Sequence, residues 1–229
     1  MPTKKEFGVH LIACATVIEE MLPHISNTMS YEKLDFGLHK NPEALKKKLQ
    51  DRLENLPRDI HTVILGYGLC SQAVVGLTCS RCTLVLPRVD DCIAIFLGSA
   101  GARREQNRIN PGTYYLTKGW IEAGDSPFDE FESFEKKYGP DAARRIMNRM
   151  LANYSRLAFI NTGPYDLERY RKRAQETAVK FRLNFEEIIG SDSLIRKMIT
   201  NNWDDEFVIV KPGGTVLLQN FIPALTVSA

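Results

Sequence analysis

The sequence lacks several features that would place it quickly in a class of proteins. It has no apolar run that suggests a membrane span. The apolar stretch near its start is too short for a secretory signal and is soon interrupted by Glu19 and Glu20. Its net charge of only +2 gives no reason to expect nucleic acid or an acidic membrane surface as a partner. These absences predict a cytoplasmic protein and argue against a periplasmic-type binding protein.

Familiar catalytic motifs are missing as well. The chain has no serine nucleophile elbow, no HExxH helix and no complete dinucleotide fingerprint, which weakens hydrolase and dehydrogenase interpretations. The turn Gly66-Tyr67-Gly68 resembles half of a phosphate-binding loop but is not followed by the Walker lysine. Five cysteines remain as the unusual feature, and in a reducing compartment they favour free thiols, metal ligation or redox chemistry over structural disulfides.

The chain alternates between apolar runs typical of buried strands and segments with helical periodicity. This alternation predicts an α/β fold with two Rossmann-like lobes, mainly parallel sheets and a cleft between the lobes. Residues 100–110 are polar and basic and are interpreted as a mobile connection. We therefore expect an N-terminal lobe over residues 1–105 that carries the cysteines, and a C-terminal lobe over 106–229.

Three cysteines each lie shortly after a predicted buried strand. Cys14 follows Val9–Ala13, Cys70 follows the strand that starts at Thr62, and Cys92 follows Thr83–Pro87. If these strands are parallel, all three thiols lie at the carboxyl edge of one sheet, where open α/β sheets bind ligands.

Three thiolates can hold three irons of a four-iron cluster, or bind zinc, and in either case one position stays open. The alternative is that each cysteine is a small buried apolar residue. Cys14, Cys70 and Cys92 are the predicted metal ligands, with an iron–sulfur cluster preferred over zinc. Cys79 and Cys82 have the spacing of half a zinc or redox motif, and are interpreted as auxiliary ligands or as incidental.

Two aspartates precede the third cysteine of this set. Asp90 and Asp91 stand where a helix begins, so that Cys92 falls in its first turn and is expected to ionise readily beside the positive end of the helix. Asp91 is the first candidate for proton transfer, although capping of this helix is the simpler interpretation.

A second polar and aromatic segment, Pro111 to Trp120, is predicted to close the cleft over the cysteines. Its candidate residues for orienting a small substrate are Lys118 and Tyr114, and further substrate contacts are expected from Tyr115, Thr117 and Trp120, together with Gly68 near the second cysteine. The alternative for the aromatic residues is ordinary core packing.

Four segments of the chain carry a resemblance to a known family. They are Leu11-Ile12-Ala13-Cys14, Gly66-Tyr67-Gly68-Leu69-Cys70, Leu86-Pro87-Arg88-Val89-Asp90-Asp91-Cys92-Ile93 with Leu97-Gly98-Ser99, and Pro111-Gly112-Thr113-Tyr114-Tyr115-Leu116-Thr117-Lys118-Gly119-Trp120. At these residues the sequence resembles the domain-of-unknown-function family numbered 1638. The family often has histidine at the position of Asp90, so this chain departs from the pattern there.

The resemblance implies a metabolic setting but no settled activity. It suggests anaerobic one-carbon or methylated-amine metabolism beside corrinoid-dependent methyltransferases. We therefore expect a cysteine-ligated metal or iron–sulfur protein that acts on a small molecule, either as an iron–sulfur lyase or as a metal-dependent methyltransferase. The competing expectation is a non-catalytic protein that carries a cofactor or assists a corrinoid methyltransferase, with a corrinoid protein or methyltransferase as its partner.

Overall fold

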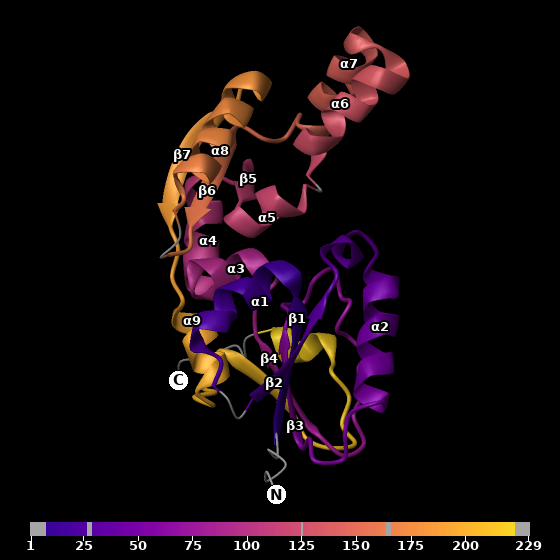
Figure 1. Cartoon of the computed structure of the whole chain (residues 1–229). Helices are drawn as coiled ribbons and strands as arrows, with labels where there is room; N and C mark the ends of the chain where they lie inside the picture. Colours follow the sequence, from indigo (N-terminus) through magenta and orange to yellow (C-terminus); the bar gives the residue numbers. More distant parts are fainter. Residues whose placement is uncertain (1–7, 27–28, 125, 164–165, 223–229) are drawn as a thin grey trace, which may run out of the picture. The chain divides into compact units, whose positions relative to one another are not determined.

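The protein is composed of two α/β units (Figure 1). The computed structural model describes residues 8–26, 29–124, 126–163 and 166–222, so Met1–Glu6 lies outside it. One unit comprises residues 1–100 and 192–229, and the other comprises 101–191. Each unit has its own sheet, built mainly or wholly of parallel strands, which confirms the predicted fold class. Within the described ranges, no helix has both the length and the apolar character needed to span a membrane.

The first unit contains a five-stranded sheet. Its strands, in spatial order, are β2 (Met29–Leu34), β1 (Val9–Cys14), β3 (Thr62–Gly66), β4 (Thr83–Pro87) and β8 (Phe207–Val210). The first four strands are parallel, whereas β8 runs antiparallel to β4. The central strands are continuous apolar runs because helices cover both of their faces, as is usual in parallel sheets.

Helix α2 (Pro42–Glu54) covers one face of this sheet. The Asn41 side chain accepts a hydrogen bond from the Ala44 amide at 3.0 Å, so the predicted Asn-Pro helix start is confirmed. Leu45, Leu49 and Leu53 of this helix pack into a core that includes alternate residues of the strands. The opposite face carries α1 (Ala15–Met21), which contacts α3 (Cys92–Leu97) and α9 (Ser193–Ile199). The 3₁₀ helices of this unit are Leu22–His24, Phe36–Lys40 and Leu218–Phe221.

The second unit has a three-stranded parallel sheet. Its order is β5 (Thr113–Leu116), β6 (Arg156–Asn161) and β7 (Asn184–Ile189). Its helices are α4 (Ala100–Ile109, which begins at the unit boundary), α5 (Lys118–Ala123), α6 (Pro127–Tyr138), α7 (Pro140–Met150) and α8 (Glu168–Phe181). Leu157 and Phe159 of the central strand are fully buried against Ala174 and Ala178 of α8.

Two predictions about the chain's organisation need correction. Residues 100–110, expected to be a mobile connection, form helix α4 because Ala, Arg, Glu and Gln favour helix even without a buried face. The expected second lobe, 106–229, ends too late, because β8 pairs with β4 and returns the last part of the chain to the first unit. The second unit is thus inserted within the sequence of the first.

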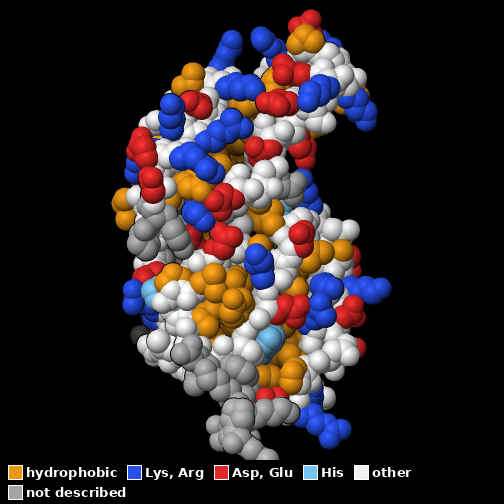
Figure 2. Space-filling model, in the orientation of Figure 1, with side chains coloured by type: hydrophobic (Ala, Val, Ile, Leu, Met, Phe, Trp, Pro, Cys, Tyr) orange, Lys and Arg blue, Asp and Glu red, His pale blue; other side chains and the backbone are white. Residues whose placement is uncertain are grey.

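Figure 2 shows basic and acidic groups interspersed on the face drawn, without a broad field of one sign. This distribution matches a formal net charge of only +2.

The antiparallel edge strand gives a test of this organisation. Replacing Phe207, which is 2% exposed, with alanine is expected to lower the free energy of unfolding by about 3–5 kcal/mol, because a large buried ring leaves a cavity. The same change at Ile209, on the same strand but 50% exposed, is expected to cost much less.

Urea unfolding measures both losses, and hydrogen exchange locates them. Phe207→Ala should speed exchange in β3 and β4 more than in β6. Equal losses for the two variants would contradict the placement of β8.

Candidate functional site

The three cysteines predicted as ligands belong to three neighbouring strands. Cys14 is the last residue of β1, Cys70 lies in the loop after β3, and Cys92 is the first residue of the helix after β4. Since β1 pairs with β3 and β3 with β4, all in parallel, these positions share the carboxyl edge of one sheet. This confirms the arrangement expected from the sequence.

The strand order also marks this edge as a ligand position. The chain passes from β1 to β2 on one side of it, and then crosses to β3 on the other side. Such a change of direction is the topological switch point at which open α/β sheets bind their ligands. Cys14 and Cys70 flank this point.

Backbone hydrogen bonds join the loops that carry Cys70 and Cys92. The Leu69 amide donates to the Val89 carbonyl at 2.7 Å, and the Cys70 amide donates to the Asp90 carbonyl at 3.0 Å. Gly68 permits this approach, because a Cβ there would lie 2.7 Å from the Val89 carbonyl oxygen. Gly68, predicted to contact substrate, therefore has a structural role in the site.

The backbone beyond β3 adopts an unusual conformation. Cys70, Ser71 and Gln72 have φ values of 46°, 54° and 69°, which lie in the left-handed region. Non-glycine residues rarely occupy it, and the cost is of order 1–3 kcal/mol each. Such strain concentrates at functional sites, where the surrounding structure holds it in place.

Burial raises the pKa of all three thiols. Each residue is only partly exposed, and the protein around it raises the pKa of Cys14, raises that of Cys70 to about 12 and raises that of Cys92 well above its usual range. Nearby charges add to this effect: Asp91 and Cys14 raise the pKa of Cys70, and Cys70, Asp91 and Cys14 raise that of Cys92. Asp35 raises the pKa of Cys14. All of these charges oppose thiolate formation.

One expectation about Cys92 is therefore wrong. Its place in the first turn of α3 predicted ready ionisation, but desolvation, the neighbouring thiols and Asp91 outweigh the dipole of a six-residue helix. Asp91 caps this helix, accepting a hydrogen bond from the Ala94 amide at 3.3 Å. This confirms the simpler interpretation, in which Asp91 caps the helix. Its carboxylate also lies close enough to Cys70 and Cys92 to raise the pKa of both thiols.

Tyr67 is a site residue that the sequence analysis missed. It is 4% exposed, and its hydroxyl has no hydrogen-bond partner among the described residues. Burial raises the pKa of Tyr67, and the nearby Cys14, Cys70 and Cys92 raise it further. The one sequence signal is its position between two glycines directly after a buried strand.

Among residues 8–26, 29–124, 126–163 and 166–222, no group of three His, Cys, Asp or Glu side chains could hold a metal ion. Thiolates on a single zinc ion lie about 3.8 Å apart, from a Zn–S bond of about 2.3 Å and tetrahedral angles. Thiolates that bind separate irons of a cluster lie farther apart, so a cluster does not require the close approach that a single ion needs.

The remaining two cysteines are bonded to each other. Cys79 and Cys82 form a disulfide of 2.00 Å, and both are buried. In this form neither can serve as an auxiliary ligand. The expectation of free thiols holds for Cys14, Cys70 and Cys92 and is wrong for this pair.

The other predicted site residues belong to the second unit. Tyr114 packs edge-on against Phe128 at 4.9 Å, and Arg103 lies over the ring of Tyr115 at 4.7 Å. The Thr117 side chain caps α5 by accepting from the Trp120 amide at 3.3 Å. The contacts of the two tyrosines are those of core packing, which was the alternative interpretation of the aromatic residues. Thr117 serves as a helix cap.

Lys118 is placed in a polar network of the same unit. Its Nζ lies 3.0 Å from Glu122, whose carboxylate also accepts a hydrogen bond from the Tyr170 hydroxyl. These partners lower the pKa of Glu122. The predicted contact of Lys118, Tyr114 and Trp120 with a substrate at the cysteines stays a prediction.

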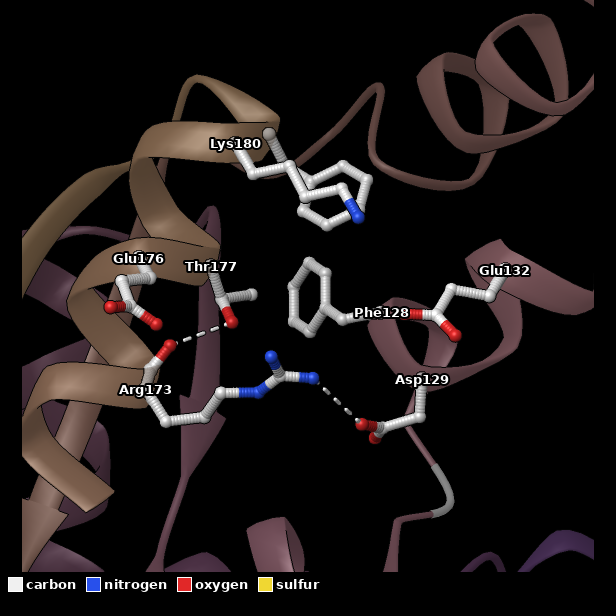
Figure 3. Close-up of a pocket in the computed structure, with 8 residues that line it drawn as sticks. Phe128, Asp129, Glu132, Arg173, Glu176, Thr177 and Lys180 are labelled. Carbon is white, nitrogen blue, oxygen red and sulfur yellow. Dashed lines mark hydrogen bonds and ion pairs between the residues drawn. The ribbon is translucent and has the colours of Figure 1, made fainter. Parts of the chain in front are cut away.

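A hollow of about 420 Å³ lies between α6 and α8 of the second unit (Figure 3). Phe128 projects into it, and Arg173 reaches toward Asp129 at 3.9 Å. Glu132, Glu176 and Lys180 complete a mixture of both charges. This mixture, unlike the cysteine site, concentrates no single chemistry.

The raised thiol pKa values predict low reactivity in metal-free protein. At pH 8, alkylation of Cys70 and Cys92 by iodoacetamide is expected to be at least ~10-fold slower than in the urea-unfolded chain, because only the thiolate reacts. The folded-state rate should keep rising above pH ~9, where the unfolded chain levels off. The unfolded chain loses these protons first, so stability falls as pH rises above about 8.5.

Mass spectrometry of pulse-labelled protein measures each rate. Labelling of Cys92 at the unfolded rate would contradict the proposed environment of the thiols.

The close approach at Gly68 gives a second test. Gly68→Ala is expected to cost about 1–3 kcal/mol of stability and to speed alkylation of Cys70, because the added methyl group forces the two loops apart. Gly37→Ala is the matched control, since the added Cβ there meets a side-chain oxygen of Asp35 at 3.0 Å rather than backbone. Urea unfolding of both variants measures the difference, and equal values would refute the steric role of Gly68.

Comparison with known families supports the resemblance seen in the sequence. The model of a family described as "Protein of unknown function (DUF1638)" matches residues 33–199. This range includes Cys70 and Cys92. No curated protein and no solved structure matches the chain. Since the match extends over more than half of its length, the chain belongs to the DUF1638 family.

Proposed function

We propose that Cys14, Cys70 and Cys92 hold an iron–sulfur cluster at the carboxyl edge of the first unit's sheet, and that the protein uses it on a small molecule. The observation that carries this proposal is the meeting of three free thiols at the carboxyl edge of three neighbouring parallel strands, with Asp91 near two of them. Three thiolates crowded there need a compensating positive charge, and a metal group supplies it.

The acidic surroundings argue against an anionic ligand bound directly by the thiols. Asp91 acts on Cys70 and Cys92, and Asp35 acts on Cys14, so a negatively charged molecule is repelled. A metal group inverts this effect, because it draws the protons off the thiols and is attracted by the same carboxylates.

A cluster held by three thiolates supplies an electrophilic iron with an open position. The chain's own residues would hold this group in place: Gly68 lets the loops meet, and Asp91 fixes the start of α3 beside Cys92. Asp91 also lies near enough to raise the pKa of both Cys70 and Cys92, which keeps it the first candidate to move a proton at a bound substrate.

Metal analysis tests the proposal directly. Protein purified without oxygen is expected to contain iron and acid-labile sulfide, and the variants Cys14→Ala, Cys70→Ala and Cys92→Ala are expected to lose most of both. The double variant Cys79→Ala with Cys82→Ala is the matched control and should keep them, since these sulfurs are bonded to each other.

Other results would change the interpretation. Zinc with the same cysteine dependence would replace the cluster with a single ion that activates a thiol for methyl transfer. A metal-free wild-type protein, even after anaerobic reconstitution, would leave three free thiols without a metal and refute the proposal.

The metabolic setting also stays a proposal. Family resemblance suggests one-carbon or methylated-amine metabolism in the cytoplasm, beside corrinoid-dependent methyltransferases. The alternative to an enzyme is an accessory protein that carries a cofactor for such a system. Turnover of a small methylated substrate by the loaded protein alone would favour the enzyme, whereas turnover only with a corrinoid protein present would favour the accessory role.

A further inference from the structure

The Tyr67 hydroxyl is a buried polar group left without a partner. Its ring packs within the main core of the first unit, and Cys14 and Cys70 pack against that core. Only 4% of the residue is exposed, and no described residue offers its oxygen a hydrogen bond. Buried hydroxyls are normally hydrogen-bonded, because leaving one unpaired loses its interaction with water and gains nothing in return.

The surroundings of this hydroxyl point to the missing partner. It interacts with all three ligand cysteines and with Glu32, so it lies close to the cysteine site. The thiol of Cys14 has a neighbour of its own, the Thr16 hydroxyl at 3.6 Å. None of the three cysteine sulfurs forms a hydrogen bond with the hydroxyl in this structure. A cluster sulfide is a strong acceptor, and it would add a possible partner for Tyr67 that the metal-free protein lacks.

We propose that the Tyr67 hydroxyl donates a hydrogen bond to a sulfur of the metal group held by Cys14, Cys70 and Cys92. Tyr67 is then a positioning residue that favours the loaded state of the site. This inference rests on the proposed function and adds to it a hydrogen-bond donor that comes from the chain itself. Hydrogen bonds to the sulfurs are among the levers by which proteins tune such groups.

The substitution Tyr67→Phe separates this role from a structural one, because it removes the oxygen and keeps the ring. In metal-free protein the variant is expected to unfold at the same or a higher urea concentration than wild type, since an unpaired buried hydroxyl is lost. In loaded protein, the variant is expected to keep metal about tenfold less well against a chelator, because a hydrogen bond to a charged sulfur is lost.

If the group is an iron–sulfur cluster, its reduction potential gives an independent readout. A hydrogen bond to sulfur stabilises the more negative, reduced form, so the potential of Tyr67→Phe should be lower than that of wild type. Tyr31→Phe is the matched control. Tyr31 lies on β2 of the same unit and is 49% exposed, so its loss should change neither metal retention nor potential.

Two results would overturn the inference while leaving the proposed function intact. One is a metal-free Tyr67→Phe that is less stable than wild type, which would mean that the hydroxyl has a partner within the protein. The other is a loaded variant with unchanged metal retention. A wild-type protein that binds no metal would instead refute the proposed function, and this inference with it.

Discussion

Parallel pairing of β1 with β3, and of β3 with β4, is the constraint on which the candidate site depends. In a parallel sheet every strand ends at the same edge, so residues far apart in sequence meet without any long-range recognition between them. Cys14, Cys70 and Cys92 are brought together by this rule alone. The contact between the loops at Gly68 then fixes how closely two of them approach.

The electrostatic character of the site follows from that geometry. Burial, together with Asp91 near two of the thiols, favours their protonated form. The neighbouring Tyr67 hydroxyl has no hydrogen-bond partner in the part of the chain that the structure describes. The metal group proposed above would change both features: its positive charge would replace the protons on the sulfurs, and a sulfide that it carries would accept a hydrogen bond from the Tyr67 hydroxyl.

Much of this arrangement could be predicted from the sequence, because local patterns encode it. Thr83–Pro87 was predicted with its observed bounds, since a buried parallel strand is a continuous apolar run. The start of α2 followed from Asn41-Pro42. The three free thiols were found because each stands just after such a strand.

Other features depend on partners that no local pattern specifies. Phe207–Val210 is visibly a strand, yet nothing in its residues says that it pairs with β4 rather than with a strand of the second unit. The spacing of Cys79 and Cys82 is common to metal, redox and disulfide pairs. Tyr67 could not be identified from the sequence, because the signal is a buried hydroxyl with no hydrogen-bond partner among the described residues. Only the folded structure reveals this feature.

The insertion of one unit within the other has a consequence for synthesis on the ribosome. The strands that carry all three cysteines emerge early, but β8, which covers the edge of β4, emerges only after the whole of the second unit. During that interval β4 presents an open, apolar edge, the kind of surface that pairs wrongly with other chains. The nascent cysteine sheet thus stays incomplete until translation of an entire intervening unit has finished.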